Sequence, residues 1–420
     1  MFKKYLLRKS YRYFHHGKDS IKWVILAVIV GIVVGLVGTA FYYCMDWVTY
    51  LREANPWLIF LLPAAGLGIV FCYRRHKGDD ALNTNLILSA VHSGDNIPLR
   101  MAPLIFASTL VTHLFGGSAG REGAALQLGG SIANGFAKLF KVKENQQNII
   151  IMCGMSAAFS AVFGTPLAAA VFAMEVVSVG IMQYSALLPC VIAALTAHLI
   201  ATQFGATAES FTVVDIPEFA LVPAGQVVLL AIFCGVASIL FCVMLHKSGH
   251  YFQIWFKNPY IRVLVGAGAV LALTLLIGNQ NYNGAGMHVI EECFNGSVPT
   301  FAFLLKMVFT AITLAVGFKG GEIVPSFFIG ASLGCLFGNL AGLSPSLCAA
   351  IGMGAVFCGV TNSPITSLLI CFELFGFEGM PYYLLAIAIS YVVSGYYGLY
   401  QSQKIIYSKY KNAYVNRKTL

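Results

Sequence analysis

The chain has 420 residues, of which 58% are hydrophobic and only 10% are charged, and its formal net charge at neutral pH is +9. Soluble globular proteins are about one quarter charged, so this composition excludes a soluble domain and predicts an all-α, polytopic membrane protein. The basic excess does not indicate nucleic-acid binding, because much of it lies near the two ends of the chain, between Lys3 and Lys22 and between Lys404 and Lys418.

These basic ends also predict the orientation. The positive-inside rule places both termini in the cytoplasm, which requires an even number of crossings of the cell (inner) membrane. Residues 1–20 are expected to form a cytoplasmic basic segment. No cleavable signal peptide is expected, since the first apolar run, Trp23 to Met45, is long enough to be a full span.

The potential metal ligands are scattered. The eleven cysteines occupy apolar positions and form no CxxC pair. His113 and His288 each stand alone in the sequence. We therefore expect buried cysteines and neither a metal site nor a cofactor.

After the first span the chain alternates apolar runs with unusual polar stretches. A second apolar run, Leu58 to Tyr73, is followed by a polar segment from Gly78 to Leu88 that is too short and too polar to cross a bilayer. Such a segment is tolerated at membrane depth only where it lines a cavity or packs inside protein. The next apolar run, Met101 to Phe115, contains no charged residue.

A glycine-rich break follows this run and is the most informative stretch of the chain. Residues 117–130 read Gly-Ser-Ala-Gly-Arg-Glu-Gly-Ala-Ala-Leu-Gln-Leu-Gly-Gly, and a helix is predicted from about Arg121 to Phe140. A helix start presents unpaired N–H groups and the positive end of the helix dipole, which suits an anion. An ionisable residue at such a break in a membrane points to function, although Arg121 and Glu122 could also simply pair and cap the helix.

The rest of the chain contains short apolar segments interrupted by glycine and proline, which is typical of the half-helices of transporters. A second polar break runs from Gly278 to Gly286, and a further glycine-rich break runs from Gly317 to Gly330. The sequence ends at Leu420, so no CBS regulatory domain is expected after the membrane region. The apolar segments are 149–163, 166–182, 187–204, 227–245, 263–277, 301–317, 347–360, 364–375 and 382–397.

The two glycine-rich breaks belong to an internal repeat. At an offset of 200 residues, Gly117, Gly120, Glu122 and Gly130 fall on Gly317, Gly320, Glu322 and Gly330. At an offset of 198, Gly154, Phe159, Pro166 and Glu175 fall on Gly352, Phe357, Pro364 and Glu373. We therefore predict a first membrane repeat over residues 21–215, a second over 216–405 and a cytoplasmic tail over 406–420. A substrate site is expected between the repeats.

Three ordered motifs resemble the CLC family of anion channels and proton-coupled anion antiporters. Residues 120–123, Gly-Arg-Glu-Gly, are similar to its GREGP motif, with Ala124 in place of proline. Residues 320–325 are similar to its GGxFxP motif, with Ile323 at the phenylalanine position. Residues 161–175 resemble the family helix that ends in a Glu pair, although Val176 replaces the second acid. The resemblance implies a CLC-type fold of two inverted repeats with many tilted and broken helices, and a homodimer.

The departures are most similar to the fluoride-exporting (CLC-F) branch. Chloride-type members have a GSGIP motif whose serine coordinates the ion, and residues 93–98, Ser-Gly-Asp-Asn-Ile-Pro, resemble it but lie too close to the GREG turn. The equivalent position falls within residues 82–85, with Asn83 favoured and Thr84 left open. Helix capping is the other interpretation of both side chains.

The resemblance assigns roles to residues in this sequence. Glu122 is expected to occupy the anion site when ionised and to leave it when protonated, which couples the two flows. Glu322 is expected to cap its own helix, and Glu175 and Glu373 to share a structural role. Phe327 could contact the anion or pack in the core, and Tyr396 and Tyr397 compete with Tyr400 as the tyrosine donor. The residues expected around the anion are Asn83, Thr84, Gly120, Arg121, Gly123, Gly321, Ile323, Val324, Phe327 and Tyr400, with Arg121 favoured as a structural partner.

The sequence therefore predicts a fluoride/proton antiporter that exports fluoride with the inward proton gradient. Its expected partners are fluoride, protons and the lipid bilayer. The alternative is a chloride-selective CLC channel or chloride/proton antiporter. An intramembrane enzyme is disfavoured, since the apolar runs contain no HExxH motif, GxSxG motif or paired aspartates.

Overall fold

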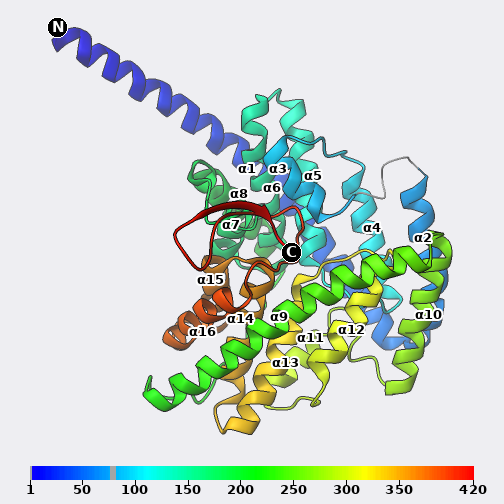
Figure 1. Ribbon diagram of the computed structural model, residues 1–420. Coiled ribbons are helices and arrows are strands. Elements are labelled where there is room, and N and C mark those ends of the chain that lie inside the picture. Colours follow the sequence, from blue (N-terminus) through cyan, green and yellow to red (C-terminus); the bar gives the residue numbers. More distant parts are fainter. Residues whose placement is uncertain (1, 76–81) are drawn as a thin grey trace.

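Helices make up most of the described chain, residues 2–75 and 82–420, in the computed structural model (Figure 1). The beginning of the polar stretch that starts at Gly78 lies outside the described residues, as do the side chains of residues 2–20. The first half contains α1 (Phe2–Ala54), η1 (Pro56–Leu61), α2 (Leu62–Arg74), α3 (Thr84–Ser93), α4 (Met101–Leu114), α5 (Glu122–Leu139), α6 (Glu144–Phe163), α7 (Pro166–Glu175), η3 (Tyr184–Ala186) and α8 (Leu187–Gln203).

The second half repeats this series of helices. It contains α9 (Leu221–Trp255), α10 (Pro259–Ile277), α11 (Met287–Phe294), α12 (Ala302–Ala315), α13 (Ile323–Ala341), α14 (Pro345–Thr361), α15 (Pro364–Phe375) and α16 (Met380–Val393). The lengths correspond as well: α4 and α12 each have 14 residues, and α5 and α13 have 18 and 19. The molecule thus has the two-repeat architecture with broken helices that the sequence pattern predicts.

The helices are apolar enough for a membrane, but many are short. Within the described ranges, seven helices are long and apolar enough to cross a bilayer, and six apolar helices have only 10–17 residues. An upright crossing needs about 20 residues. The short helices therefore begin or end inside the protein, where their terminal N–H and C=O groups can meet a pathway or another helix.

Close helix contacts in both halves depend on glycine. A Cβ atom on Gly129 of α5 would lie 2.1 Å from the carbonyl oxygen of Gly154 in α6. The repeat-related pair behaves alike, because a Cβ on Gly330 of α13 would lie 2.2 Å from the carbonyl oxygen of Gly352 in α14. In lipid, where helix association depends on packing, such small residues let backbones approach closely. These contacts hold the two broken helices α5 and α13 firmly in the interior.

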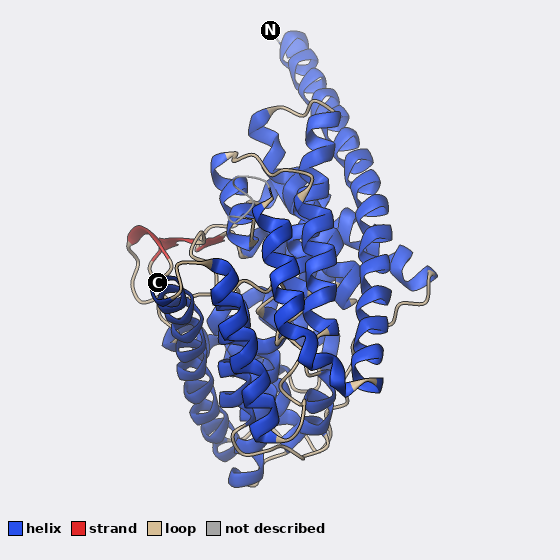
Figure 2. Ribbon diagram, turned by 90° about the vertical axis from the view of Figure 1, so that its right-hand side faces the viewer, coloured by secondary structure: helices blue, strands red, loops and turns tan. Residues whose placement is uncertain are grey.

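The two ends of the chain differ from what the sequence indicated. The basic N-terminal segment is the first part of α1 and projects beyond the packed helices (Figure 1). The C-terminal end of the chain forms β2 (Lys404–Tyr407) and β3 (Tyr414–Lys418) and pairs with β1 (Ser178–Val179) in the order β1-β2-β3, a pairing that the sequence did not indicate. Figure 2 shows these strands at one edge of the helical body. Isoleucine, tyrosine and valine in this tail favour strands.

Candidate functional site

The two glycine-rich breaks meet in the interior. Gly120, just before α5, and Gly321, just before α13, exchange backbone hydrogen bonds, each N–H donating to the other carbonyl at 2.7 Å. This bridge brings the N-terminal ends of two repeat-related helices together. Each end carries N–H groups without partners in their own helix and a partial positive charge. The arrangement is therefore suited to an anion.

The bridge requires the glycines of both motifs. A Cβ on Gly321 would lie 2.5 Å from the backbone nitrogen of Gly123, and one on Gly320 would lie 2.4 Å from the Cβ of Ala119. Both distances are well inside van der Waals contact, so a side chain at either position would push the two breaks apart. Gly120, Gly123 and Gly321 thus lie together at the meeting point, as the sequence predicts.

Glu122 lies at the start of α5 and is fully buried. Its Oε2 accepts a hydrogen bond from the backbone N–H of Arg121 at 3.2 Å. Its Oε1 lies 3.4 Å from the Nε of Arg121 and accepts no hydrogen bond from any described residue. A buried carboxylate oxygen with so little compensation is costly in the interior, which favours either protonation or movement of the side chain.

Arg121 binds a second carboxylate more closely. Its Nη2 donates to Oε1 of Glu209 at 2.6 Å, and its guanidinium lies 5.1 Å from the ring centroid of Tyr42. Arg121 and Glu122 do pair, as one interpretation of the sequence held, but the pair extends to a third residue. The positive charge of Arg121 is thereby balanced on two sides, so this side chain is engaged before any anion arrives.

A cavity of about 280 Å³ reaches Arg121 and the first turn of α13. Charged and titratable side chains of both signs line it, so it is a polar approach to the buried bridge. The lining residues of these types are Tyr42, Asp46, Arg52, Glu53, His113, Arg121, Glu209, His288 and Glu291, and Val324 lines it from α13.

The beginning of α3 faces the same interior region. Thr84 is buried, and its hydroxyl accepts a hydrogen bond from Nε2 of Gln127 in α5 at 3.0 Å. A hydroxyl that accepts one bond can still donate its own proton. Asn83 is exposed, and its side-chain oxygen caps α3 by accepting from the backbone N–H of Leu86 at 3.2 Å. Capping thus occupies the oxygen of Asn83, while its amide nitrogen remains the group that would bind an anion.

Tyr400 follows α16 and lies 1% exposed, with a hydroxyl that makes no hydrogen bond to the described residues. Its segment is tied to α3, because the backbone N–H of Ser402 donates to the side-chain oxygen of Asn85 at 3.0 Å. A buried hydroxyl without a hydrogen-bond partner can donate a hydrogen bond to a ligand.

The competing tyrosines have other positions. The hydroxyl of Tyr396 lies 2.8 Å from that of Ser408 in the C-terminal tail. Tyr397 is half-buried and contributes its backbone carbonyl to the side chain of Asn362 at 3.0 Å. Among the three candidates, Tyr400 is the one with a buried hydroxyl that has no hydrogen-bond partner among the described residues.

The first turn of α13 is buried at Ile323, Val324 and Phe327. Phe327 packs between Phe163, whose ring is stacked on it at 5.5 Å, and Phe357, whose ring is tilted at 5.2 Å, so core packing accounts for its burial. Glu322 occupies the N-cap position, but its side chain makes no capping hydrogen bond, so the expected capping role is wrong. Its carboxylate instead lies 3.4 Å from where a Cβ on Gly123 would be, beside the bridge.

A glutamate in the last turn of each of α7 and α15 caps the other helix. Glu175 accepts from the backbone N–H groups of Ile365 and Thr366 at 3.1 Å and 2.8 Å, and from the Thr366 hydroxyl at 2.6 Å. Glu373 accepts from the N–H groups of Leu167 and Ala168, each at 2.9 Å. Both carboxylates satisfy helix N-termini of the other half, which is a shared structural role.

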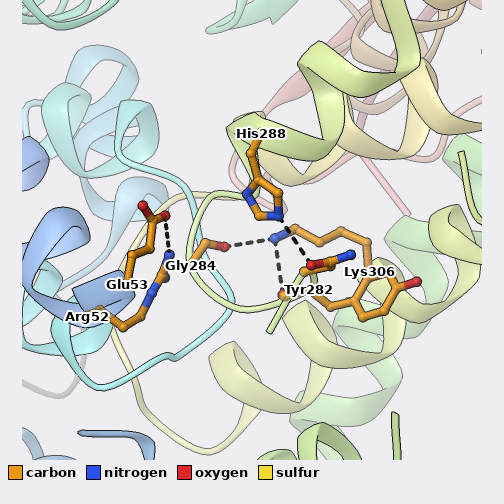
Figure 3. A network of polar contacts seen from close by, with 7 residues as sticks. Arg52, Glu53, Tyr282, Gly284, His288 and Lys306 are labelled. Atoms are coloured by element: carbon orange, nitrogen blue, oxygen red, sulfur yellow. Dashed lines mark hydrogen bonds and ion pairs between the residues drawn. The ribbon is translucent and has the colours of Figure 1, made fainter. Parts of the chain in front are cut away.

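The polar break at residues 278–286 is held by two buried cations (Figure 3). Lys306 of α12 is fully buried, and its Nζ donates to the carbonyls of Tyr282 and Gly284 at 3.2 Å and 2.7 Å. The guanidinium of Arg52, beside Glu53, lies against Gly284, where an added Cβ would be 1.9 Å from its Nη1. Gly284 in turn donates its N–H to the carbonyl of Gly117 at 3.1 Å. The loop therefore buttresses the turn that leads into α5.

Sequence reasoning missed Glu209, Arg52 and Lys306. Glu209 lies 88 residues from its partner Arg121, and Lys306 lies more than 20 residues from the carbonyls that it binds. One signal was available for Lys306, since it is a lone charge inside an apolar run. The sequence around Glu209 carried no comparable signal.

Comparisons with known proteins agree with this architecture. A family model described as voltage gated chloride channel matches residues 65–395. A chloride/fluoride channel protein of Pseudomonas syringae pv. tomato is 37% identical over 397 residues, covering 93% of this chain and 88% of that protein. An H⁺/Cl⁻ exchange transporter of Vibrio vulnificus is 26% identical over 397 residues, covering 86% and 84%. The crystal structure of a CLC-type fluoride/proton antiporter superposes with a TM-score of 0.88 at 32% identity, covering 92% of this chain and 98% of the other.

Proposed function

The chain belongs to the voltage-gated chloride channel (CLC) family, and we propose that it is a fluoride/proton antiporter which exports fluoride from the cytoplasm. The observation that carries this proposal is the buried carboxylate of Glu122 at the bridge between Gly120 and Gly321. A proton neutralises the Glu122 carboxylate, and an anion at that point is repelled by the carboxylate while it is ionised. Binding of either species therefore displaces the same side chain, and this links the two flows.

The anion site would be built from partial charges. Backbone N–H groups at the starts of α5 and α13 and the hydroxyls of Tyr400 and Thr84 would replace part of the hydration shell of a small anion. Asn83 would meet the anion at the exposed start of α3. An uncompensated Arg or Lys would bind an anion too tightly for turnover, whereas dipoles and hydroxyls permit both entry and exit. Arg121 and Lys306 are each already engaged by acceptors, which supports this assignment.

Transport would proceed in alternating steps. Ionised Glu122 occupies the anion site and closes it. A proton arriving through the polar cavity neutralises the carboxylate, which then moves away, so that fluoride can bind at the helix ends. When fluoride departs, Glu122 returns and releases its proton to the other side. Net fluoride export would follow from the inward proton gradient, with both termini of the chain in the cytoplasm and the protein in the cell (inner) membrane. The role is transport, not enzymatic catalysis.

The choice of fluoride over chloride rests on the chain's own residues and on its relatives. The serine motif of chloride-type members is absent where α3 begins, and Asn83 and Thr84 stand there instead. Ser93 lies at the end of α3, where its hydroxyl donates to Asp95 at 2.7 Å, far from a helix start. A fluoride/proton antiporter and a chloride/fluoride channel protein are among the similar proteins.

Ion flux from liposomes tests the proposal. Protein reconstituted into vesicles loaded with equal concentrations of fluoride and chloride should release fluoride at least about tenfold faster, a difference of about 1.4 kcal/mol in barrier. Ion-selective electrodes read both anions, and protein-free vesicles give the leak. Chloride efflux as fast as fluoride efflux would favour the chloride channel or exchanger instead.

We further propose that the protein is a homodimer. The short helices α7, α8, α15 and α16 lie together on one side of the molecule (Figure 1) and contact one another. Large apolar side chains are exposed along this side: Leu167, Leu187, Leu188, Leu195, Leu199, Ile365 and Leu384. Because α7 and α15 are too short to span alone, a second copy would cover them better than lipid.

Single-molecule photobleaching of labelled protein in liposomes tests the assembly. The native protein should bleach in two steps, and Leu199→Trp, which enlarges a side chain at the centre of this side, should shift the population toward one step. Leu275→Trp on α10 is the matched control, since Leu275 is exposed on a different helix. One-step bleaching of the native protein would exclude the dimer.

A further inference from the structure

Arg121 is shared unequally between two carboxylates. Its guanidinium lies 2.6 Å from Oε1 of Glu209 but 3.4 Å from Oε1 of Glu122. The Glu122 side chain is fully buried, whereas that of Glu209 is 25% exposed and lines the polar cavity. The closer partner of the arginine is therefore the carboxylate that does not sit at the anion site.

The chain holds Glu209 rigidly, although it belongs to the irregular segment 204–220 that joins the two repeats. Thr207 lies beside the hydroxyl of Tyr42, with 3.4 Å between the oxygens. Ala208 packs on Gly164, where an added Cβ would lie 2.5 Å from its own Cβ. Phe211 donates its N–H to the carbonyl of Leu374 at 3.0 Å and stacks on Phe294 at 4.7 Å. Contacts on both sides of Glu209 thus fix where its carboxylate points.

We propose that Glu209 is a positioning residue for the gate: it competes with Glu122 for the Arg121 guanidinium and so keeps the Glu122 carboxylate loosely held and free to leave. This deepens the proposed antiport function and rests on it. Without Glu209, Arg121 would have Glu122 as its main carboxylate partner. A tighter ion pair stabilises the ionised form of Glu122, and protonation then requires a more acidic solution.

Other charged and titratable groups also surround the gate. They belong to α1, α4, α11, the starts of α5 and α13, and the segment after α16, and they contribute a background field that a substitution at Glu209 leaves in place. These groups are Tyr42, Asp46, Arg52, Glu53, His113, Arg121, His288, Glu291, Glu322 and Tyr400. Glu209 lies 2.6 Å from the Arg121 guanidinium. Its removal should therefore change the pairing of Glu122 more directly than the removal of any of these groups other than Arg121 itself.

The pH dependence of fluoride flux tests this role. Fluoride exchange is measured in liposomes at equal pH on both sides, from about pH 5.5 to pH 8.5. Glu209→Gln should move the pH of half-maximal flux toward acid by roughly one unit, since an opposite charge at close range stabilises an ionised carboxylate by that order. Glu218→Gln is the matched control, because Glu218 is an exposed glutamate of the same segment, and it should leave the midpoint unchanged.

A second substitution of Glu209 and a double variant complete the test. Glu209→Ala should give the same acid shift, and whichever of the two variants elutes as a single folded species suffices for the comparison. In a Glu122→Gln background, which has no gating carboxylate to titrate, loss of Glu209 should change flux less than about twofold. A wild-type midpoint in the folded Glu209 variants, or an equal loss of flux in both backgrounds, would overturn the proposal. Failure of the antiport function itself is distinct, since the native protein would then show no coupled fluoride flux.

Discussion

At the scale of single residues, the buried cations Arg121 and Lys306 already have acceptors within the protein before an anion enters. Arg121 is bound by Glu209 and Glu122, and Lys306 by two backbone carbonyls. Leaving either cation uncompensated in a buried site would cost several kcal/mol and would trap an anion. With the cations occupied, the proposed mechanism leaves the substrate to weakly charged donors such as the hydroxyl of Tyr400, which has no hydrogen-bond partner among the described residues.

The residues that could be predicted are those whose chemistry is local. Glu122 and its flanking glycines form one continuous motif, so a helix start, a tight turn and an acid could all be read from adjacent positions. The caps at Asn83 and the packing of Phe327 were left as alternatives, and the structure shows that each occurs. Glu209 and Lys306 act through partners distant in sequence, and no local pattern encodes such tertiary pairs.

At the scale of elements, α7 and α15 depend on each other. Each has a glutamate in its last turn that accepts hydrogen bonds from the first turn of the other. The exchange fixes the two repeats against each other at a point where short helices end inside the protein. It also explains why the repeat conserves a Pro and a Glu at the same spacing, since proline starts each helix and glutamate caps its partner.

Removing one of these caps should destabilise the fold without altering selectivity. Glu175→Ala leaves the N–H groups of Ile365 and Thr366 without their acceptor, at a cost of about 2–6 kcal/mol, because each of these two unsatisfied donors costs about 1–3 kcal/mol. Thermal unfolding in detergent should show a lower midpoint than for the native protein, whereas Glu218→Ala on the exposed linker should not. An unchanged midpoint for Glu175→Ala would contradict the capping role.

The helical elements could largely be predicted because apolar runs, glycine breaks and prolines mark them directly. The C-terminal strands could not, since β2 is stabilised by β1 from between α7 and α8, more than 200 residues earlier. The length of α1 was also missed. The basic segment and the apolar run that follows it contain no proline, so the two continue as one helix from Phe2 to Ala54.

At the scale of the whole molecule, duplication explains why the site lies where it does. Two halves with the same order of helices bring their broken helices to one place, and the Gly120–Gly321 bridge joins them. The segment between the halves then supplies Glu209, so the linker of the repeats contributes to the site that they form. The repeat boundaries near residue 215 remain a prediction that fits this arrangement.

The central claim is that protons and fluoride compete for the position of one carboxylate. It is tested most directly by recording proton uptake with a pH electrode while a fluoride gradient drives efflux from vesicles containing Glu122→Gln. Proton uptake should be abolished, while it persists in Glu218→Gln, which neutralises an exposed carboxylate of the segment between the two repeats. Proton uptake by Glu122→Gln at the native rate would contradict the account.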